Sequence, residues 1–478
     1  MSAAPLPPGF RIRLRPEGRL DAGRVLVGGS PLRAVRLARS ADELAPGGVL
    51  TVRDAATAAL ARKLLAGNLA DPAPGTPADA SLITVVVPVR DRSPQLDRCL
   101  AALEGLSVVV VDDASRDRAA VAAVAARHGA ELLRLDVNVG PASARNAGLT
   151  RVRTPLVAFV DSDVRAPAMM LRSLGAQLVD PRVALAGPIV RGVAVSARVR
   201  WWERYDEACS ALTLGRRPCA VQPGAFVSWL PSACLVGRTE ALRAVGGFAE
   251  GLRVAEDVDL VWRLVAAGHG VRYQPEHVAL HEARSSLGSW LGRKVLYGSG
   301  GAVLAERHGG AVAPAVLSPA MGLAALAVMQ RRWWSIPAAA AAVGWGTRSV
   351  RRSLPPVAGR DAAAGRIATQ ALGWALFQEA DLVTRHWWPG VAVACLVSRG
   401  ARRTTVSALV VDAVVQLAMD RPRIDPATGW LGRRLDDLAY GAGLWLGALR
   451  ARSLRCLAPR FVTSSPRRRP AGKTNAPH

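Results

Sequence analysis

The chain has 478 residues, more than one hydrophobic core usually serves, so two or three domains are expected. Half of the residues are hydrophobic, which excludes a wholly disordered protein. The formal net charge of +25 comes almost entirely from arginine. It favours an acidic partner, and nucleic acid, anionic lipid and a phosphate-bearing substrate all remain open.

The cysteines and the N-terminus bear on the compartment. The six cysteines show neither metal-type pairing nor the density of a disulfide scaffold, which indicates a reducing environment. The first fifteen residues lack the apolar core of a secretory signal, and charges interrupt them early. We therefore expect the active part of the protein to face the cytoplasm.

The N-terminal part reads as a small domain of its own. Residues 24–37, "RVLVGGSPLRAVRL", predict two short strands around a Gly-Gly turn, and 53–68 predict a helix. Residues 73–81 are rich in turn formers and predict a linker. The first domain is therefore expected to span 1–72.

The next part alternates strands with helices. The strands expected here are rich in β-branched residues and apolar on both faces, and they lie at 82–89, 106–113, 130–137 and 156–163. Helical patterns separate them. This alternation is typical of a parallel sheet covered on both faces, an α/β fold. A helix over 256–268 and a strand over 271–281 are expected further on.

The C-terminal part, 306–458, is apolar, rich in arginine and predicted to be helical. The stretch 311–330 has no charged residue over roughly the length of a bilayer crossing, and Arg-Arg-Trp-Trp follows it. A membrane span, a buried Ala-rich hairpin and an interfacial helix are alternatives for this part. The tail, 459–478, is expected to be disordered.

Two acids close the strand "LVAFVDSDV". Asp161 and Asp163 lie two residues apart, and like charges this close repel unless a cation lies between them. Aspartates so spaced at a strand end can both face one Mg²⁺ or Mn²⁺ ion, which keeps room for substrate phosphates. The alternative is that Asp161 caps the next turn and Asp163 is solvated.

Other strand ends are polar as well, and ligands of α/β sheets bind at the carboxyl ends of the strands. Asp113 or its neighbour Asp112 could accept hydrogen bonds from a nucleobase or a ribose, although either could be a helix cap. Gly140 permits a tight loop, and Arg145 can approach a diphosphate. An ordinary strand-to-helix turn is the alternative there.

Seven blocks in a fixed order, among them "VVVPVRDR", "VAFVDSDV" and "AEDVDLVWRL", resemble the motifs of the inverting family 2 glycosyltransferases. The resemblance covers roughly 82–285. It implies an α/β protein with a GT-A domain, a Rossmann-like nucleotide-diphospho-sugar transferase fold, over 82–305. A small N-terminal α+β winged-helix-like domain and an α-helical C-terminal region would flank it.

The resemblance also implies a nucleotide pocket and a metal site. Asp161, Asp163 and His281 would hold Mn²⁺ or Mg²⁺; an imidazole ligand favours manganese, and His277 is the local competitor. The residues that would line the nucleotide pocket are Pro88, Arg90, Asp91, Asp112, Asp113, Arg145, Asp161 and Ser162.

The block "EDVDL" would supply the catalytic base. Inversion requires an acceptor hydroxyl to attack opposite the leaving diphosphate, and a carboxylate must remove its proton. Asp257 matches the family's base position, with Glu256 beside it, and Asp259 is expected to be structural. The alternative is that all three acids serve the helix macrodipole.

The flanking regions narrow the choice of acceptor. The N-terminal domain resembles winged-helix domains that recognise precursor peptides of ribosomally made natural products, and its exposed strand could take up an extended peptide. The whole layout resembles the mycofactocin-system glycosyltransferases of actinobacteria. That implies transfer of glucose, from UDP-glucose, to a peptide-derived acceptor, with an oligosaccharide as product, at the cytoplasmic side of the cell membrane.

Two rival functions are considered. A membrane glycosyltransferase that makes cell-wall polysaccharide or glycolipid would share the catalytic motifs, but it predicts a "QxxRW" motif that the sequence lacks. A basic nucleic-acid-binding protein would explain the net charge. It predicts arginines clustered with exposed aromatics, whereas arginines here are scattered along the chain.

Overall fold

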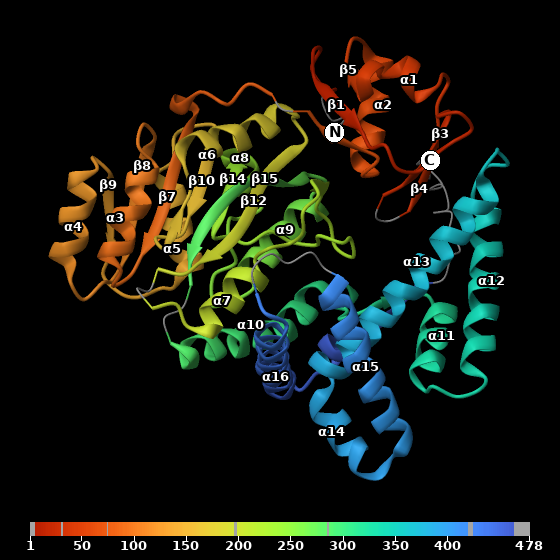
Figure 1. Ribbon diagram of the computed structural model, residues 1–478. Helices are drawn as coiled ribbons and strands as arrows, with labels where there is room; N and C mark the ends of the chain where they lie inside the picture. The colour runs from red at the N-terminus through yellow and green to blue at the C-terminus, as the bar shows by residue number, and fades with distance from the viewer. Residues whose placement is uncertain are drawn as a thin grey trace, which may run out of the picture. The chain divides into compact units, whose positions relative to one another are not determined.

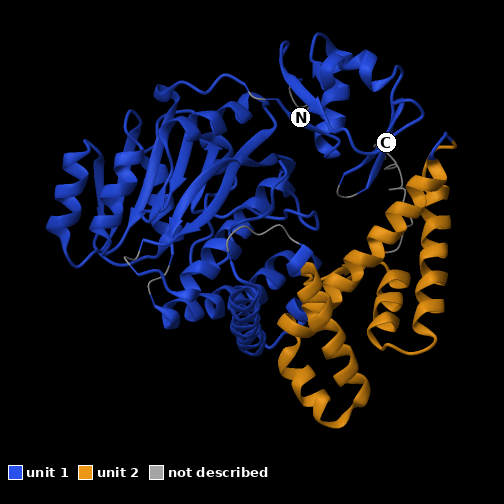
Figure 2. Cartoon of the chain, viewed as in Figure 1, with its two compact units in different colours: residues 1–312, 357–359, 416–457 blue, residues 313–356, 360–415, 458–478 orange. Residues whose placement is uncertain are grey.

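The computed structural model describes residues 5–29, 32–73, 75–195, 198–283, 286–418 and 424–462 (Figure 1). It divides into two compact units, coloured separately in Figure 2. Unit 1 comprises residues 1–312, 357–359 and 416–457, and unit 2 comprises 313–356, 360–415 and 458–478.

The N-terminal part of unit 1 is an α+β domain with its own hydrophobic core. Its strands form two three-stranded sheets, in the orders β5-β1-β6 and β2-β3-β4. The expected hairpin is confirmed as β3 (Val25–Gly28) and β4 (Arg33–Arg36). The expected helix is confirmed as α2 (Ala55–Ala66), and Asp54 and Thr57 form a capping box at its N-terminus. The remaining elements are β1 (Arg11–Leu14), β2 (Arg19–Leu20), α1 (Ala41–Leu44), β5 (Val49–Thr51) and β6 (Ala70–Pro72).

A nine-stranded sheet forms the centre of unit 1. Eight strands follow the order β11-β15-β12-β14-β10-β7-β8-β9, and β13 pairs with β15 (Figure 1). The strands are β7 (Ile83–Val89), β8 (Ser107–Asp113), β9 (Glu131–Leu135), β10 (Leu156–Val160), β11 (Val164–Arg165), β12 (Val183–Val193), β13 (Cys219–Ala220), β14 (Cys234–Arg238) and β15 (Gly270–Glu282).

The four strands expected between 82 and 163 are confirmed as β7, β8, β9 and β10, and neighbours within this set pair in parallel. The parallel pairing expected for this part of the chain is therefore confirmed, and the other strands add antiparallel pairs to the sheet. β14 pairs antiparallel with both β10 and β12, and β11 pairs antiparallel with β15. The sheet is therefore mixed, with one reversed strand beside the acid-bearing strand β10.

Helices cover both faces of this sheet. Successive side chains of a strand point to opposite faces of the sheet. In β7, Val85 and Val87 belong to one core, and Val86 between them belongs to the other. Each fully buried valine contributes roughly 2 kcal/mol. One face is packed by α3 (Ser93–Ala102), α4 (Arg118–Arg127) and α6 (Ala168–Gly175), and the other by α5 (Pro141–Arg151), α8 (Thr239–Ala244) and α9 (Glu256–Ala266).

Two long helices of unit 1, α10 (Leu287–His308) and α16 (Pro426–Arg450), pack through glycines. A Cβ at Gly298 would lie 2.1 Å from Tyr440 O, and one at Gly443 would lie 1.9 Å from Val295 O. Lys294 Nζ and Asp436 Oδ2 form a buried ion pair at 2.7 Å. The absence of side chains at these glycines lets the two backbones touch. The helix α7 (Trp201–Cys209) also contacts α16.

Unit 2 is helical, as expected for this part of the chain. The uncharged stretch 311–330 contains the short strand β16 and the 11-residue helix α11, not one continuous helix. Within the described part of the chain, no helix combines the length and apolar character that a bilayer crossing needs. The elements are β16 (Val316–Leu317), α11 (Pro319–Met329), α12 (Ser335–Ser353), α13 (Arg360–Asp381), α14 (Trp388–Val397), α15 (Arg399–Ala418) and β17 (Arg460–Phe461).

The expectation of a disordered tail is wrong at its start, because Arg460 and Phe461 form β17, which pairs with β16. The rest of that tail, 463–478, lies outside the described residues. All six cysteines are free thiols, in agreement with the absence of a disulfide pattern.

The glycine contact between α10 and α16 gives a stability test. Gly298→Ala places a methyl group against Tyr440 O, so we expect a loss of roughly 1–3 kcal/mol in the free energy of unfolding. Gly292→Ala on the same helix is the matched control, because nothing lies within 4 Å of its Cβ. It should be neutral or gain up to about 1 kcal/mol. Equal denaturation midpoints for the two variants would contradict the packing described.

Candidate active site

Arg145 is the buried centre of the site. It lies on α5, which packs closely on the sheet because Gly148 has no side chain: a Cβ there would lie 2.3 Å from Val86 Cγ1. The guanidinium donates to Asp161 Oδ1 at 2.5 Å and to Glu256 Oε1 at 3.1 Å. Arg145 therefore joins the end of β10 to the start of α9.

The charge of Arg145 is held by its partners. Burial disfavours a charged guanidinium, but the attraction of Asp161 and Glu256 outweighs this effect and raises the pKa of Arg145. The ring of Phe248 lies 5.3 Å from the guanidinium carbon, at cation–π distance. Loss of either carboxylate would leave a buried charge partly unpaired, which is strongly destabilising.

The two aspartates at the end of β10 each face a cation of the protein. Asp161 accepts from Arg145, and Asp163 accepts from Arg92 in the loop after β7. The pairing of β11 with β15 sets His281 opposite Val164, and His281 Nε2 lies 3.6 Å from Asp163 Oδ1. Arginine thus relieves the repulsion that the sequence posed between these acids.

The structure assembles the predicted metal ligands only in part. Asp163 and His281 lie together, whereas Asp161 turns to Arg145, and Ser162 between the aspartates is buried. No three Asp, Glu, His or Cys side chains among the described residues form a group that could hold a metal ion. The donor types, two carboxylates and an imidazole, still suit a divalent cation.

The loops after β7 and β8 are tied together by Asp91. Its Oδ1 accepts from the backbone N–H of Arg116 at 2.7 Å, and its own N–H donates to Ser115 Oγ at 3.0 Å. Asp91 has a left-handed φ of 53°, which is uncommon outside glycine and marks a constrained loop. Pro88 lies at the end of β7, and Arg90 beside Asp91 remains exposed.

Asp112 and Asp113 are both buried and serve the protein's own backbone and side chains. Asp112 accepts from Arg134 Nη1 at 2.5 Å. Asp113 accepts from the backbone N–H groups of Val139 and Gly140, at 2.7 and 2.9 Å. Asp113 therefore fixes the loop that leads into α5 and Arg145. Neither acid caps the helix after β8, the alternative that the sequence left open, because Asp117 is the N-cap of α4.

The first turn of α9 carries Glu256 and Asp257. Ser232 holds both: its Oγ contacts Glu256 Oε1, and its backbone N–H donates to Asp257 Oδ2, each at 3.3 Å. The N–H of Val258 donates to Asp257 Oδ1 at 2.8 Å. The residue before the helix, Ala255, has a left-handed φ of 65°, so the chain makes a strained turn where the predicted base lies.

The protonation of Asp257 is tuned by its surroundings. Burial and the neighbouring charge of Glu256 raise the pKa of Asp257 to about 7. A carboxylate with a pKa near the operating pH is suited to general base catalysis. Asp259 instead is fully buried and accepts from Arg263 and Arg307, each at 2.7 Å, which agrees with its expected structural role.

Comparison with known proteins matches this chain to glycosyltransferases. Residues 84–227 match the model of Glycosyl transferase family 2, and 156–350 match that of Glycosyl transferase family group 2. A pre-mycofactocin glycosyltransferase of Mycobacterium tuberculosis is 38% identical over 484 residues, which cover 97% of this chain and 100% of that protein. The chain belongs to glycosyltransferase family 2. Its sheet domain accordingly has the expected GT-A fold.

Two further proteins are less similar. A validoxylamine A glucosyltransferase of Streptomyces hygroscopicus is 35% identical over 124 residues, 23% of this chain and 29% of that protein. A mannosyltransferase of Pyrobaculum calidifontis, solved in complex with GDP-Man and Mn²⁺, is 17% identical. The structural match covers 78% of this chain and 90% of the mannosyltransferase chain, and its TM-score is 0.40.

Two residues of the site escaped the sequence analysis. Arg92 pairs with Asp163, and Ser232 holds both acids of α9. The motif "VVVPVRDR" already contained Arg92, and the parallel pairing of β7 with β10 could have suggested it. Ser232 likewise lies in a motif block, "LPSACLVGRTEALRAVGGF", but the reversal of β14, which follows it, is not visible in the sequence.

The role of Asp257 as the base predicts a pH dependence for glycosyl transfer, because its pKa is raised to about 7. A base acts in its ionised form, so kcat/KM should rise about tenfold between pH 6 and pH 8. Glu256→Gln removes the neighbouring charge that raises this pKa, so the acidic limb of the profile should move to lower pH. A flat profile between pH 6 and 8 in the wild-type enzyme would contradict this role.

Proposed function

We propose that this chain transfers a hexose, glucose from UDP-glucose, to a peptide-derived acceptor of mycofactocin biosynthesis, with inversion at the anomeric carbon. The observation that carries the proposal is the bridge of Arg145 between Asp161 and Glu256, since it sets the predicted donor site beside the predicted base. The long match to a pre-mycofactocin glycosyltransferase supports the acceptor class.

Arginine side chains and loops held by hydrogen bonds lie at the predicted donor site. Arg145 and Arg92 lie at the end of β10, and the exposed Arg90 follows β7 at the same edge of the sheet. Guanidinium groups bind phosphate oxygens in a planar, bidentate manner. Asp91 and Asp113 hold the adjoining loops in place for the nucleotide.

On the acceptor side, Asp257 takes the proton of the attacking hydroxyl. The N–H groups of Ser232 and Val258 fix its carboxylate, and the charge of Glu256 keeps it basic enough to accept a proton near neutral pH. Glu256 in turn is held by Arg145. The proton acceptor and the diphosphate-binding arginine are thus positioned through one shared carboxylate.

We assign the metal, Mn²⁺ or Mg²⁺, to Asp161, Asp163 and His281. The close approach of Asp163 to His281 and the partial exposure of Asp161 support this donor set. When bound, such a cation supplies charge stabilisation to the departing diphosphate.

The flanking parts of the chain extend the proposal. The strand β4 forms an edge of its small sheet and could pair with an extended peptide. The exposed apolar residues of unit 2 support association with the cytoplasmic side of the cell membrane. Synthesis of a cell-wall polysaccharide or glycolipid is the second candidate, and the same apolar residues favour it.

The test is a panel of nucleotide sugars with Mn²⁺, scored for UDP release with and without a peptide-derived acceptor. We expect acceptor-dependent release from UDP-glucose that is lost in EDTA. The Asp257→Asn variant should lose transfer by at least about a hundredfold, the usual contribution of a general base, yet keep nucleotide binding.

A matched control is Asp97→Ala, which removes an acid from the outer surface of α3 and should leave transfer unchanged. Normal transfer by the Asp257→Asn variant would show that another group removes the proton, and Asp257 would no longer stand as the base.

The second candidate is separated by where the labelled sugar goes. Radiolabel from UDP-glucose should appear in a soluble product if the acceptor is peptide-derived. Its appearance in the lipid extract instead would favour the glycolipid or polysaccharide enzyme.

A further inference from the structure

One end of unit 2 brings two distant segments together. The turn between α11 and α12 lies against the start of α15, because Gln330 Nε2 donates to Thr404 Oγ1 at 2.6 Å and Ser407 Oγ donates to Met329 O at 2.7 Å. In Figure 2 both the α11–α12 turn and the α14–α15 turn lie at the lower end of the orange unit. Residues near 331–336 and 396–403 therefore share one region of the surface.

Large apolar side chains are exposed in this region. Trp333 is 88% exposed, Ile336 80%, Leu396 78% and Val397 86%. The helix α14 is almost wholly apolar, yet none of its residues is buried. Single exposed apolar residues are ordinary, but a cluster of this kind marks an interaction site.

The same region is basic. The sequence has no Asp or Glu in 307–360 or in 382–411, the two stretches that supply it. Among the described residues, Arg331, Arg332 and Arg399 form no ion pair with a carboxylate. We name the Arg–Trp face by its members: Arg331, Arg332, Trp333, Trp334, Ile336, Leu396, Val397, Arg399, Arg402 and Arg403.

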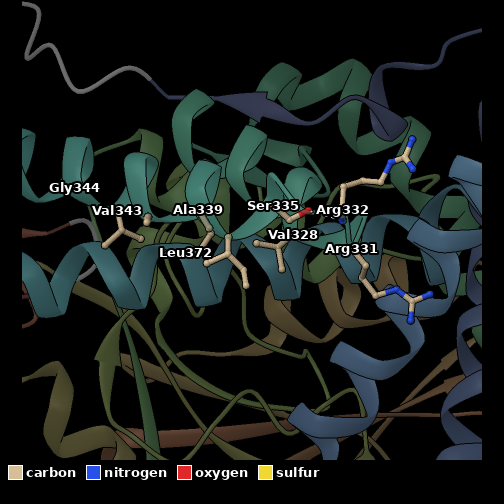
Figure 3. A pocket seen from close by; sticks show the side chains of 10 residues that line it. Val328, Arg331, Arg332, Ser335, Ala339, Val343, Gly344 and Leu372 are labelled. Carbon is tan, nitrogen blue, oxygen red and sulfur yellow. Dashed lines mark hydrogen bonds between the residues drawn. The ribbon is translucent and has the colours of Figure 1, made fainter.

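A groove leads away from the Arg–Trp face. Its volume is about 870 Å³, and Arg331 and Arg332 lie at one end of it (Figure 3). The rest of its wall is mostly apolar and includes Val328, Val343 and Leu372. Cations at the mouth and an apolar wall behind them match an anionic headgroup and its acyl chain.

We propose that the Arg–Trp face docks on an anionic phospholipid bilayer. The tryptophans and aliphatic side chains would enter the boundary between headgroups and acyl chains, and the arginines would contact the phosphates. This inference rests on the membrane association put forward under the proposed function and names the surface responsible. A second copy of the chain is a poor occupant, since a symmetric contact would set arginines against arginines.

The test is flotation of the full chain with vesicles, without donor or acceptor. We expect binding to phosphatidylcholine vesicles that contain phosphatidylglycerol, weaker binding in high salt, and little binding to pure phosphatidylcholine. Because no substrate is present, a failure of the proposed glycosyl transfer leaves this result unaffected. Equal binding to both kinds of vesicle would overturn the inference.

Two pairs of substitutions test whether the Arg–Trp face is the surface that binds the vesicles. Arg331→Gln with Arg332→Gln should weaken vesicle binding about thirtyfold, given the usual contribution of each arginine near a charged membrane. Trp333→Ser with Val397→Ser should weaken it through loss of apolar contact, which keeps the test independent of charge. Both pairs are exposed, so unchanged thermal unfolding should verify that the variants fold.

The matched control is Arg348→Gln with Arg352→Gln, which removes the same charge from exposed positions near the other end of α12. It should bind vesicles nearly as the wild-type chain does. An equal loss in this control would overturn the inference, because it would assign binding to the overall charge. Two other results would overturn the inference. If the chain self-associates and Trp333→Ser blocks this, a second copy of the chain occupies the face. If a single-stranded oligonucleotide displaces the vesicles, nucleic acid occupies it.

Discussion

The buried guanidinium of Arg145 constrains the rest of the site. A buried charge is costly unless hydrogen-bonded partners surround it, and Asp161 and Glu256 are those partners. They come from β10 and α9, so the strand and the helix must meet at α5. Gly148 lets α5 lie close to the sheet, and Asp113 holds the loop that leads into α5. These two ionic contacts thus hold the predicted donor site beside the predicted base.

Much of this could be predicted from the sequence. The strands β7, β8 and β10 are continuous apolar runs whose ends carry polar residues, so their existence and their shared edge followed from pattern alone. The acids of α9 were also evident. These features are local, because each depends on a few neighbouring residues.

The remainder depends on contacts between distant residues. The reversal of β14 beside β10 has no local signature, and neither has the pairing of Asp112 with Arg134. The ion pairs of the two aspartates are a further case: spacing grouped Asp161 with Asp163, but it did not show that Arg145 pairs with the first and Arg92 with the second. The abundance of arginine, which left nucleic acid, anionic lipid and a phosphate-bearing substrate open, supplies partners to buried carboxylates in unit 1 and lies beside exposed apolar residues in unit 2.

The most direct measurement of the central claim is a double-mutant cycle on kcat/KM with Arg145→Gln and Asp161→Asn. If the pair acts as one unit, the double variant should be little slower than the slower single variant, a coupling of at least about 1 kcal/mol. Losses that add within about 0.5 kcal/mol would contradict the account, because the two residues would then act independently.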